Sequence, residues 1–187
     1  MKNKLKLIIA LIVVASTTTF AQKKEIKTSE STINWTGKKV TGSHAGTLSF
    51  SSGYLTFEGD QISGGEFTVD MTSLTVTDLK AGAGKEKLEG HLNSDDFFGV
   101  ANHKTAKLTI KKATKGKEGY SIEGSLTIKG KTNPITFDLA IKENAATTTL
   151  KVDRTKYDIK YGSGSFFDNL GDKTISDEFE LAVNLKM

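Results

Sequence analysis

Hydrophobic and polar residues alternate along most of this chain, which is the pattern of β-strands with one buried face. The last segment shows it most clearly, because Phe179, Leu181 and Val183 share one face and polar or charged residues occupy the other. The alternation predicts eight strands, at residues 26–35, 45–58, 61–78, 105–114, 118–130, 133–144, 147–160 and 173–187. Eight antiparallel strands can close on themselves and leave no free edge, so we predict an all-β fold that forms an eight-stranded antiparallel barrel.

The hydrophobic residues change parity at one point within the third predicted strand. Phe67, Val69 and Met71 share one face, whereas Leu74 and Val76 continue on the other. One extra residue in a strand produces such a change, so we predict a β-bulge at residues 72–73.

The strand pattern stops between residues 78 and 100. Residues 85–89 together with Leu92 predict one short helix there, between two strands. The chain shows no linker and no low-complexity tract, so residues 22–187 are predicted to form one domain with its own hydrophobic core.

The first 21 residues have the pattern of a cleaved secretory signal peptide. Three lysines precede an apolar run at residues 7–15, and small residues lead up to Ala21. The run is too short to cross a bilayer, which needs about 20 residues, so we expect no stable membrane anchor. We therefore expect cleavage near Ala21 and a periplasmic or secreted bacterial protein.

Net charge excludes nucleic acid as a partner. The formal charge of +4 belongs mainly to the predicted signal peptide, and residues 22–187 carry 23 basic and 22 acidic side chains. The lysines are scattered along the predicted strands and turns, whereas nucleic-acid binding needs a basic patch or stripe.

No motif indicates catalysis, a metal or a cofactor. The three histidines, His44, His91 and His103, lie in separate segments without the close spacing that local metal sites favour. His44 is interpreted as a turn residue and His91 as a structural hydrogen-bonding group at the end of the predicted helix. No arrangement of serine, histidine and acid has local support, so we predict that the protein is not an enzyme.

Arg154 is the only arginine, against 25 lysines, which indicates a position that needs a planar guanidinium group. An unpaired buried guanidinium would be costly, so we expect an ion pair in or at the rim of the barrel. The candidate partners are Asp70, Asp96 and Asp138. Direct contact with an anionic head group is the alternative.

The stretch at residues 90–100 combines two aspartates with two neighbouring phenylalanines. It predicts a tight turn in which Asp95 caps backbone N–H groups while Phe97 and Phe98 point inward. Such a turn could anchor or plug a hollow β structure.

Six segments, in order and spacing, resemble the YceI family of exported, polyisoprenoid-binding proteins. The match is carried by residues 33–40, 44–48, 64–71, 91–98, 124–130 and 152–159. Its most specific part is His-Leu-x-Ser-x-Asp-Phe-Phe at residues 91–98. The resemblance implies a lipocalin-like barrel whose apolar interior takes a polyisoprenoid-like lipid, such as an isoprenoid quinone or a polyprenyl derivative.

The resemblance also implies transport, storage or sequestration of that lipid without chemical change, and a homodimer is a candidate assembly. Two other functions stay open: an enzyme that acts on such a lipid inside the barrel, and a filled-core barrel that acts as an interaction module. The module would have no continuous cavity and a substantial exposed apolar patch.

The alternating faces supply the candidate ligand-binding residues, although parity alone does not say which face is inside. They are Trp35, Phe67, Val69, Met71, Phe97, Phe98, Leu126, Ile128, Phe137, Leu139, Phe179, Leu181 and Val183. His44, His91 and Arg154 are added as polar or structural candidates.

Overall fold

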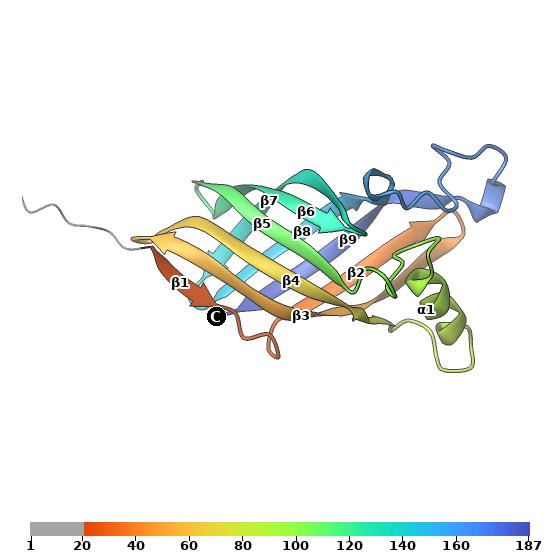
Figure 1. Ribbon diagram of the computed structural model, residues 1–187, viewed down its shortest axis with the longest axis horizontal. Coiled ribbons are helices and arrows are strands. Elements are labelled where there is room, and N and C mark those ends of the chain that lie inside the picture. Colours follow the sequence, from red (N-terminus) through yellow and green to blue (C-terminus); the bar gives the residue numbers. More distant parts are fainter. Residues whose placement is uncertain (1–20) are drawn as a thin grey trace, which may run out of the picture.

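The computed structural model describes residues 21–187, which form an elongated antiparallel β-barrel with a helix at one end (Figure 1). The predicted signal peptide, apart from Ala21, lies outside the described residues. The strands are β1 (Gln22–Glu25), β2 (Thr32–Lys39), β3 (Gly42–Glu58), β4 (Gln61–Val76), β5 (Thr105–Lys115), β6 (Tyr120–Ile128), β7 (Lys131–Lys142), β8 (Ala145–Asp153) and β9 (Ile175–Lys186). The helices are α1 (Lys85–Asn93) and two short 3-10 helices, η1 (Arg154–Tyr157) and η2 (Gly171–Lys173).

The barrel wall has eight strand positions, as predicted. Hydrogen bonding follows the order β3-β2-β9-β8-β7-β6-β5-β4, and β4 pairs back with β3 to close the barrel. The short β1 pairs with the second half of β3, and β2 pairs with the first half. Together β1 and β2 therefore occupy a single position in the wall.

The prediction of one continuous strand at residues 26–35 was wrong, because the chain turns between β1 and β2. Ser31 stabilises this turn: its hydroxyl donates to the carbonyl of Lys27 at 2.9 Å and accepts the backbone N–H of Lys186 at 3.0 Å. The second partner lies 155 residues away. The alternation of hydrophobic and polar residues at 26–35 therefore gave no indication that the strand is interrupted there.

The strand predicted at residues 147–160 is also shorter than expected. Asp153 ends β8, because its carboxylate accepts the backbone N–H of Thr155 at 3.0 Å and the Thr155 hydroxyl at 2.6 Å. This cap starts η1, and Asp158 then turns the chain with a φ of 63°. A side chain that competes for backbone N–H groups favours such a turn over a strand.

The predicted bulge is confirmed. Thr47 pairs with Thr75 and Ser49 pairs with Asp70. Over this stretch β4 therefore contains more residues than β3. This extra length lets Met71 and Leu74 both point inward, at 4% and 7% exposure.

Interior side chains form two clusters along the barrel. The first packs near α1 and contains Trp35, Leu92 and Phe97, whereas the second packs at the opposite end and contains Leu55 and Ile122. We call these the mouth end and the closed end; in Figure 1, α1 marks the mouth end, and β1 and the C-terminus lie toward the closed end.

Candidate functional site

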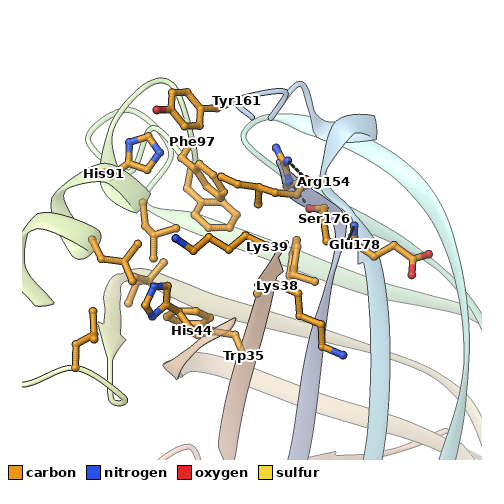
Figure 2. Close-up of a pocket in the computed structure, with 18 of the residues that line it drawn as sticks. Trp35, Lys38, Lys39, His44, His91, Phe97, Arg154, Tyr161, Ser176 and Glu178 are labelled. Atoms are coloured by element: carbon orange, nitrogen blue, oxygen red, sulfur yellow. Dashed lines mark hydrogen bonds between the residues drawn. The ribbon is translucent and has the colours of Figure 1, made fainter. Parts of the chain in front are cut away.

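A cavity of about 560 Å³ lies inside the mouth end, and we call it the mouth cavity (Figure 2). The barrel wall contributes apolar side chains to it: Trp35, Leu48, Leu74, Phe179 and Leu181. The helix and the loops cover it with Leu79, Leu88, Leu92, Phe97, Phe98 and Tyr161. Ligand pockets are commonly between about 300 and 1,000 Å³ and mainly apolar, so this cavity has the size and chemistry of a binding site.

Trp35 lies on the wall of this cavity because the strand opposite leaves room for its ring. Gly46 is the cross-strand partner of Trp35, and a Cβ atom at Gly46 would lie only 2.5 Å from the indole and 1.9 Å from the carbonyl oxygen of Thr75. The side chain of Trp35 is buried, and its Nε1 donor has no hydrogen-bond partner. The indole therefore fills the space that Gly46 leaves on β3.

The loop after α1 brings Phe97 and Phe98 over the cavity. Ser94 ends the helix, because its backbone N–H and its hydroxyl both donate to the carbonyl of His91, at 3.1 and 2.7 Å. The prediction that the Asp95 side chain caps this turn was wrong: Asp95 contributes only its backbone carbonyl, to Lys129 at 2.6 Å. The inward direction of the rings is confirmed, and their centroids lie 5.2 Å apart.

His91 packs among aromatic rings, and its predicted role as a hydrogen-bonding group was wrong. Its ring centroid lies 4.4 Å from that of Tyr161 and 5.5 Å from that of Phe97. Its Nε2 is buried, and residues 21–187 provide it with no hydrogen-bond partner. The ring of His91 is therefore part of the aromatic cover of the mouth cavity.

His44 lies in strand β3, opposite Gly37, and not in a turn as predicted. Its Nδ1 lies 2.8 Å from Oδ2 of Asp78, whose other oxygen accepts the backbone N–H of Ala45 at 3.1 Å. Burial acts to raise the pKa of Asp78, but the hydrogen bonds from His44 and Ala45 outweigh it, so the pKa lies below its ordinary value of 3.8. This pair ties the segment that leads into α1 to the rim of the barrel.

Arg154 is a structural group that joins η1 to the start of β9. Its guanidinium donates to the backbone carbonyls of Ser176, Ile159 and Ile175 at 2.9, 2.8 and 3.1 Å. The expectation of an ion pair is confirmed, but the three predicted partners were wrong, because the carboxylate at 3.7 Å belongs to Asp177. Burial lowers the pKa of Arg154, and the charge of Asp177 opposes this change.

The predicted partners of Arg154 have other positions. Asp70 caps the bulge by accepting from Thr72, and Asp96 is exposed. Asp138 lies on the outer face of β7, since its neighbours Phe137 and Leu139 both line the interior. Once the inward face of β7 is known, the alternation along this strand therefore excludes Asp138 as a partner of Arg154 inside the barrel.

Unfolding free energy is expected to decrease below about pH 4. The carboxyl groups of Asp78 and Asp177 both have pKa values below 3.8 in the folded protein; for Asp177, burial is outweighed by hydroxyl donors and by Arg154. Their stabilisation is present above the unfolded pKa and is lost as the pH falls through the folded pKa. Urea unfolding between about pH 7 and about pH 3 measures this loss. Asp78→Asn should flatten the pH dependence, and equal pH dependence in both proteins would contradict the assignment.

The rim of the mouth cavity is charged and open to solvent. Lys38, Lys39 and Glu178 are exposed residues that line the cavity, and Lys87 adds a further charge from α1. None of these four takes part in the ion pairs found within residues 21–187. A charged rim above an apolar interior suits an amphiphile, which has a polar head group and an apolar chain.

A second, smaller cavity of about 70 Å³ lies deeper in the barrel, and we call it the inner cavity. Apart from Thr148, it is lined by apolar side chains, which include Phe67, Phe137, Leu139 and Leu185. Leu181 is the residue that borders both cavities.

Eleven of the thirteen predicted ligand-binding residues border one of the two cavities. The mouth cavity contacts Trp35, Phe97, Phe98, Phe179 and Leu181, and the inner cavity contacts Phe67, Val69, Leu126, Phe137, Leu139, Leu181 and Val183. Met71 and Ile128 border neither and are buried in the first cluster. The predicted face therefore points inward, and contact with a ligand stays a prediction.

Several cavity residues escaped the sequence reasoning. Leu79, Leu88 and Tyr161 come from α1 and the loops, where no alternating pattern indicates an inward face. Leu48 and Leu74 belong to strands, and their alternation with polar neighbours was the signal that could have identified them.

Other kinds of site find little support in the described part of the chain. Within residues 21–187, no three His, Asp or Glu side chains gather closely enough to hold a metal ion. The helices of the same region include none with the length and apolar character to span a bilayer. The filled-core alternative predicted no continuous cavity, which the mouth cavity contradicts.

The closed barrel and its cavity can be compared with known proteins. Residues 25–187 match the model of the YceI-like domain. A UPF0312 protein of Serratia proteamaculans is 32% identical over 69 residues, which span 37% of this chain and 36% of that protein. Among solved structures, Burkholderia cenocepacia BcnA superposes with a TM-score of 0.70 at 19% identity, over 86% of this chain and 98% of BcnA.

A polyisoprenoid-binding domain from Saccharophagus degradans, implicated in plant cell wall breakdown, shares the fold at a TM-score of 0.57 and 13% identity. The similarity covers 89% of this chain and 99% of that domain. The eight-stranded barrel, its end helix and the match over residues 25–187 show that this chain belongs to the YceI-like family.

Proposed function

We propose that this protein binds a polyisoprenoid or a similar amphiphile in the mouth cavity and holds it without changing it chemically. The single observation that carries the proposal is an apolar cavity of about 560 Å³ inside a closed barrel. Charged side chains border it at the rim and apolar side chains line its interior, so an apolar chain inside it would lie against apolar surface.

Hydrocarbon burial supplies enough free energy for such binding. Each buried CH₂-sized group contributes about 0.8 kcal/mol, so one isoprene unit of five carbons contributes up to about 4 kcal/mol. Immobilising the chain offsets much of this gain. A few units therefore suffice for tight binding with few polar contacts.

The charged rim favours an amphiphile over a pure hydrocarbon. Lys38, Lys39 and Glu178 are exposed and border the cavity. A polar head group on the ligand, such as the ring of an isoprenoid quinone or the hydroxyl of a polyprenyl alcohol, would lie at this rim while the apolar chain lies inside. The polyisoprenoid-binding domain of Saccharophagus degradans, which shares the fold, supports the same ligand class.

The setting of this function is part of the proposal. The signal-peptide pattern at residues 1–21 favours export, so the protein would transport, store or sequester the lipid in the periplasm or outside the cell. A water-filled compartment between membranes is one in which an insoluble lipid needs a carrier.

Purified protein is expected to carry lipid. Organic extraction followed by mass spectrometry should recover an amphiphile, and delipidated protein should take up a fluorescent polyprenyl probe and return it unchanged. Recovery of no amphiphile together with no probe uptake would refute the proposal. A modified probe would instead support an enzyme, and native mass spectrometry of the loaded protein tests the homodimer.

A further inference from the structure

We propose that the mouth end of the barrel docks on a lipid bilayer through four exposed apolar residues, and that the mouth cavity is loaded from this bilayer. We call the four residues the mouth patch; they are Val40, Tyr161, Phe166 and Phe167. Docking is a property of the surface alone, whereas the loading step rests on the proposed function.

The mouth patch gathers the exposed large hydrophobic side chains of residues 21–187 at one end of the barrel. Val40 is 66% exposed, and Tyr161, Phe166 and Phe167 are 49%, 49% and 51% exposed. Single exposed apolar residues are normal on a protein surface. Apolar side chains that gather at one place instead indicate an interaction site.

Backbone hydrogen bonds place Val40 beside the segment at residues 160–174, which carries the three aromatic residues. The N–H of Val40, in the turn between β2 and β3, donates to the carbonyl of Thr174 at 3.1 Å. The N–H of Ile175 donates to the carbonyl of Gly162 at 2.8 Å, so the two ends of the segment lie together. In Figure 1 this segment, drawn in blue, projects at the mouth end.

The tip of the segment presents Phe166 and Phe167 to solvent. The backbone N–H groups of both residues donate to the carbonyl of Ser163, at 3.2 and 3.0 Å, which forms a tight turn. All residues from 164 to 169 are exposed. The two phenylalanines therefore have no cover from the described part of the chain.

Tyr161 joins the mouth patch to the mouth cavity. It is half-exposed, it borders the cavity, and its ring centroid lies 4.4 Å from that of His91 (Figure 2). Lys39, the neighbour of Val40 in sequence, borders the cavity too. An apolar chain that leaves a bilayer at the mouth patch would therefore reach the cavity without crossing open water.

The charges around the mouth patch nearly balance. Residues 38–42 and 158–174 carry four lysines and three aspartates, and Glu178 at the rim makes the two numbers equal. Lys160 is paired with Asp158 at 3.0 Å, and its ammonium lies 5.0 Å from the ring centre of Phe166. Membrane binding depends on buried apolar area and on attraction to anionic lipids, so the apolar side chains should dominate here.

The size of the mouth patch favours a bilayer over a second copy of this chain. A half-exposed aromatic residue presents about 100 Å², so the patch presents on the order of 400 Å². A stable interface buries about 800 Å² on each partner. A bilayer needs no complementary surface of that size, and aromatic residues are enriched at the membrane–water interface.

Flotation with vesicles of phosphatidylcholine, alone or mixed with phosphatidylglycerol, tests the docking. The protein should bind both kinds of vesicle, and anionic lipid or added salt should change binding by less than about threefold. Phe166→Ser together with Phe167→Ser should lower binding by at least about tenfold, because two aromatic side chains no longer enter the apolar layer.

Lys117→Ser together with Glu118→Ser is the matched control. These neighbouring exposed residues lie in the turn between β5 and β6 at the closed end, and the net charge is kept. Binding should stay within about twofold. Equal binding by the two double variants, or no binding of the unsubstituted protein to either kind of vesicle, would overturn the inference.

A fluorescent label tests the orientation without changing the mouth patch. The chain has no cysteine, so Asp168→Cys and Glu118→Cys each give one labelling site and each remove one acidic group. Vesicles should shift the emission of an environment-sensitive label to the blue at residue 168 and not at residue 118. The reverse result would overturn the inference.

The loading step is measured separately from docking. The phenylalanine double variant should take up a polyprenyl probe from cyclodextrin normally, since neither residue borders the mouth cavity, but more slowly from vesicles. Equal uptake rates from vesicles would overturn loading at the patch. Failure of the unsubstituted protein to take up the probe from either source would refute the proposed function, whereas flotation still decides docking. A dimer in sedimentation velocity that the double variant abolishes, without vesicle binding, would assign the patch to a second copy.

Discussion

Gly37→Trp is expected to abolish lipid binding while the barrel stays folded. Gly37 lies on β2 with the same parity as Ile33 and Trp35, and it borders the mouth cavity. A Cβ atom at this position meets no atom within 4 Å. A tryptophan side chain of ten non-hydrogen atoms is therefore expected to project into the mouth cavity and to take space that a ligand would otherwise occupy.

The expected loss of affinity is at least about 100-fold. Each displaced CH₂-sized group of the ligand costs about 0.8 kcal/mol, and the new indole takes the place of several such groups. Unfolding free energy should be unchanged or higher, because the indole buries apolar surface of its own. Displacement titration with a polyprenyl probe measures the affinity, and urea unfolding measures the stability.

Asn34→Trp is the matched control. Asn34 lies on the same strand but on the exposed outer face, so its substitution should leave binding within about twofold. A Gly37→Trp protein that binds the probe as well as the unsubstituted protein would show that the lipid is held elsewhere.

Arg154→Met is expected to lower the unfolding free energy by about 3–5 kcal/mol. Arg154 is 2% exposed, so its three hydrogen bonds to backbone carbonyls are shielded from water. Methionine would leave these carbonyls without donors and Asp177 without its positive partner. Folded domains are commonly stable by about 5–15 kcal/mol, so the loss is a large part of the total.

Urea unfolding tests this prediction with two further variants. Lys151→Met, at an exposed position of β8, should change stability by less than about 0.5 kcal/mol. Arg154→Lys should recover only part of the loss, because an ammonium group lacks the planar fork that reaches three carbonyls. A loss of less than about 1 kcal/mol in Arg154→Met would contradict the structural role of Arg154.

The two predictions separate stability from binding. Both residues line the mouth cavity, but Gly37 borders empty space, whereas Arg154 donates three hydrogen bonds to backbone carbonyls. Several inward-facing residues around the cavities, among them Phe179, Leu181 and Val183, are only half-buried. The protein therefore leaves apolar surface uncovered where a ligand would cover it.

The wall of the barrel was largely predictable from the sequence. Alternation located all eight strand positions, and the parity change between Met71 and Leu74 located the bulge. The errors fell where side chains act on the backbone: Ser31 breaks the first predicted strand, and Asp153 ends β8.

The candidate site was predictable only in part. Strand residues of the cavities, such as Phe179 and Leu139, follow from alternation, because a strand places every second side chain on the same face. Leu88 and Tyr161 come from a helix and a loop, where alternation gives no information. The partner of Arg154 was missed because three nearby backbone carbonyls, and not only charge, determine where its guanidinium lies.

By itself, the sequence determined that this chain forms a barrel of eight strand positions and which side chains share each face. Only the tertiary structure decided that the barrel holds a large cavity at the mouth end and a much smaller one deeper inside. The physical reason is that alternation is a property of each strand, whereas an empty volume depends on how side chains from opposite walls meet across the barrel.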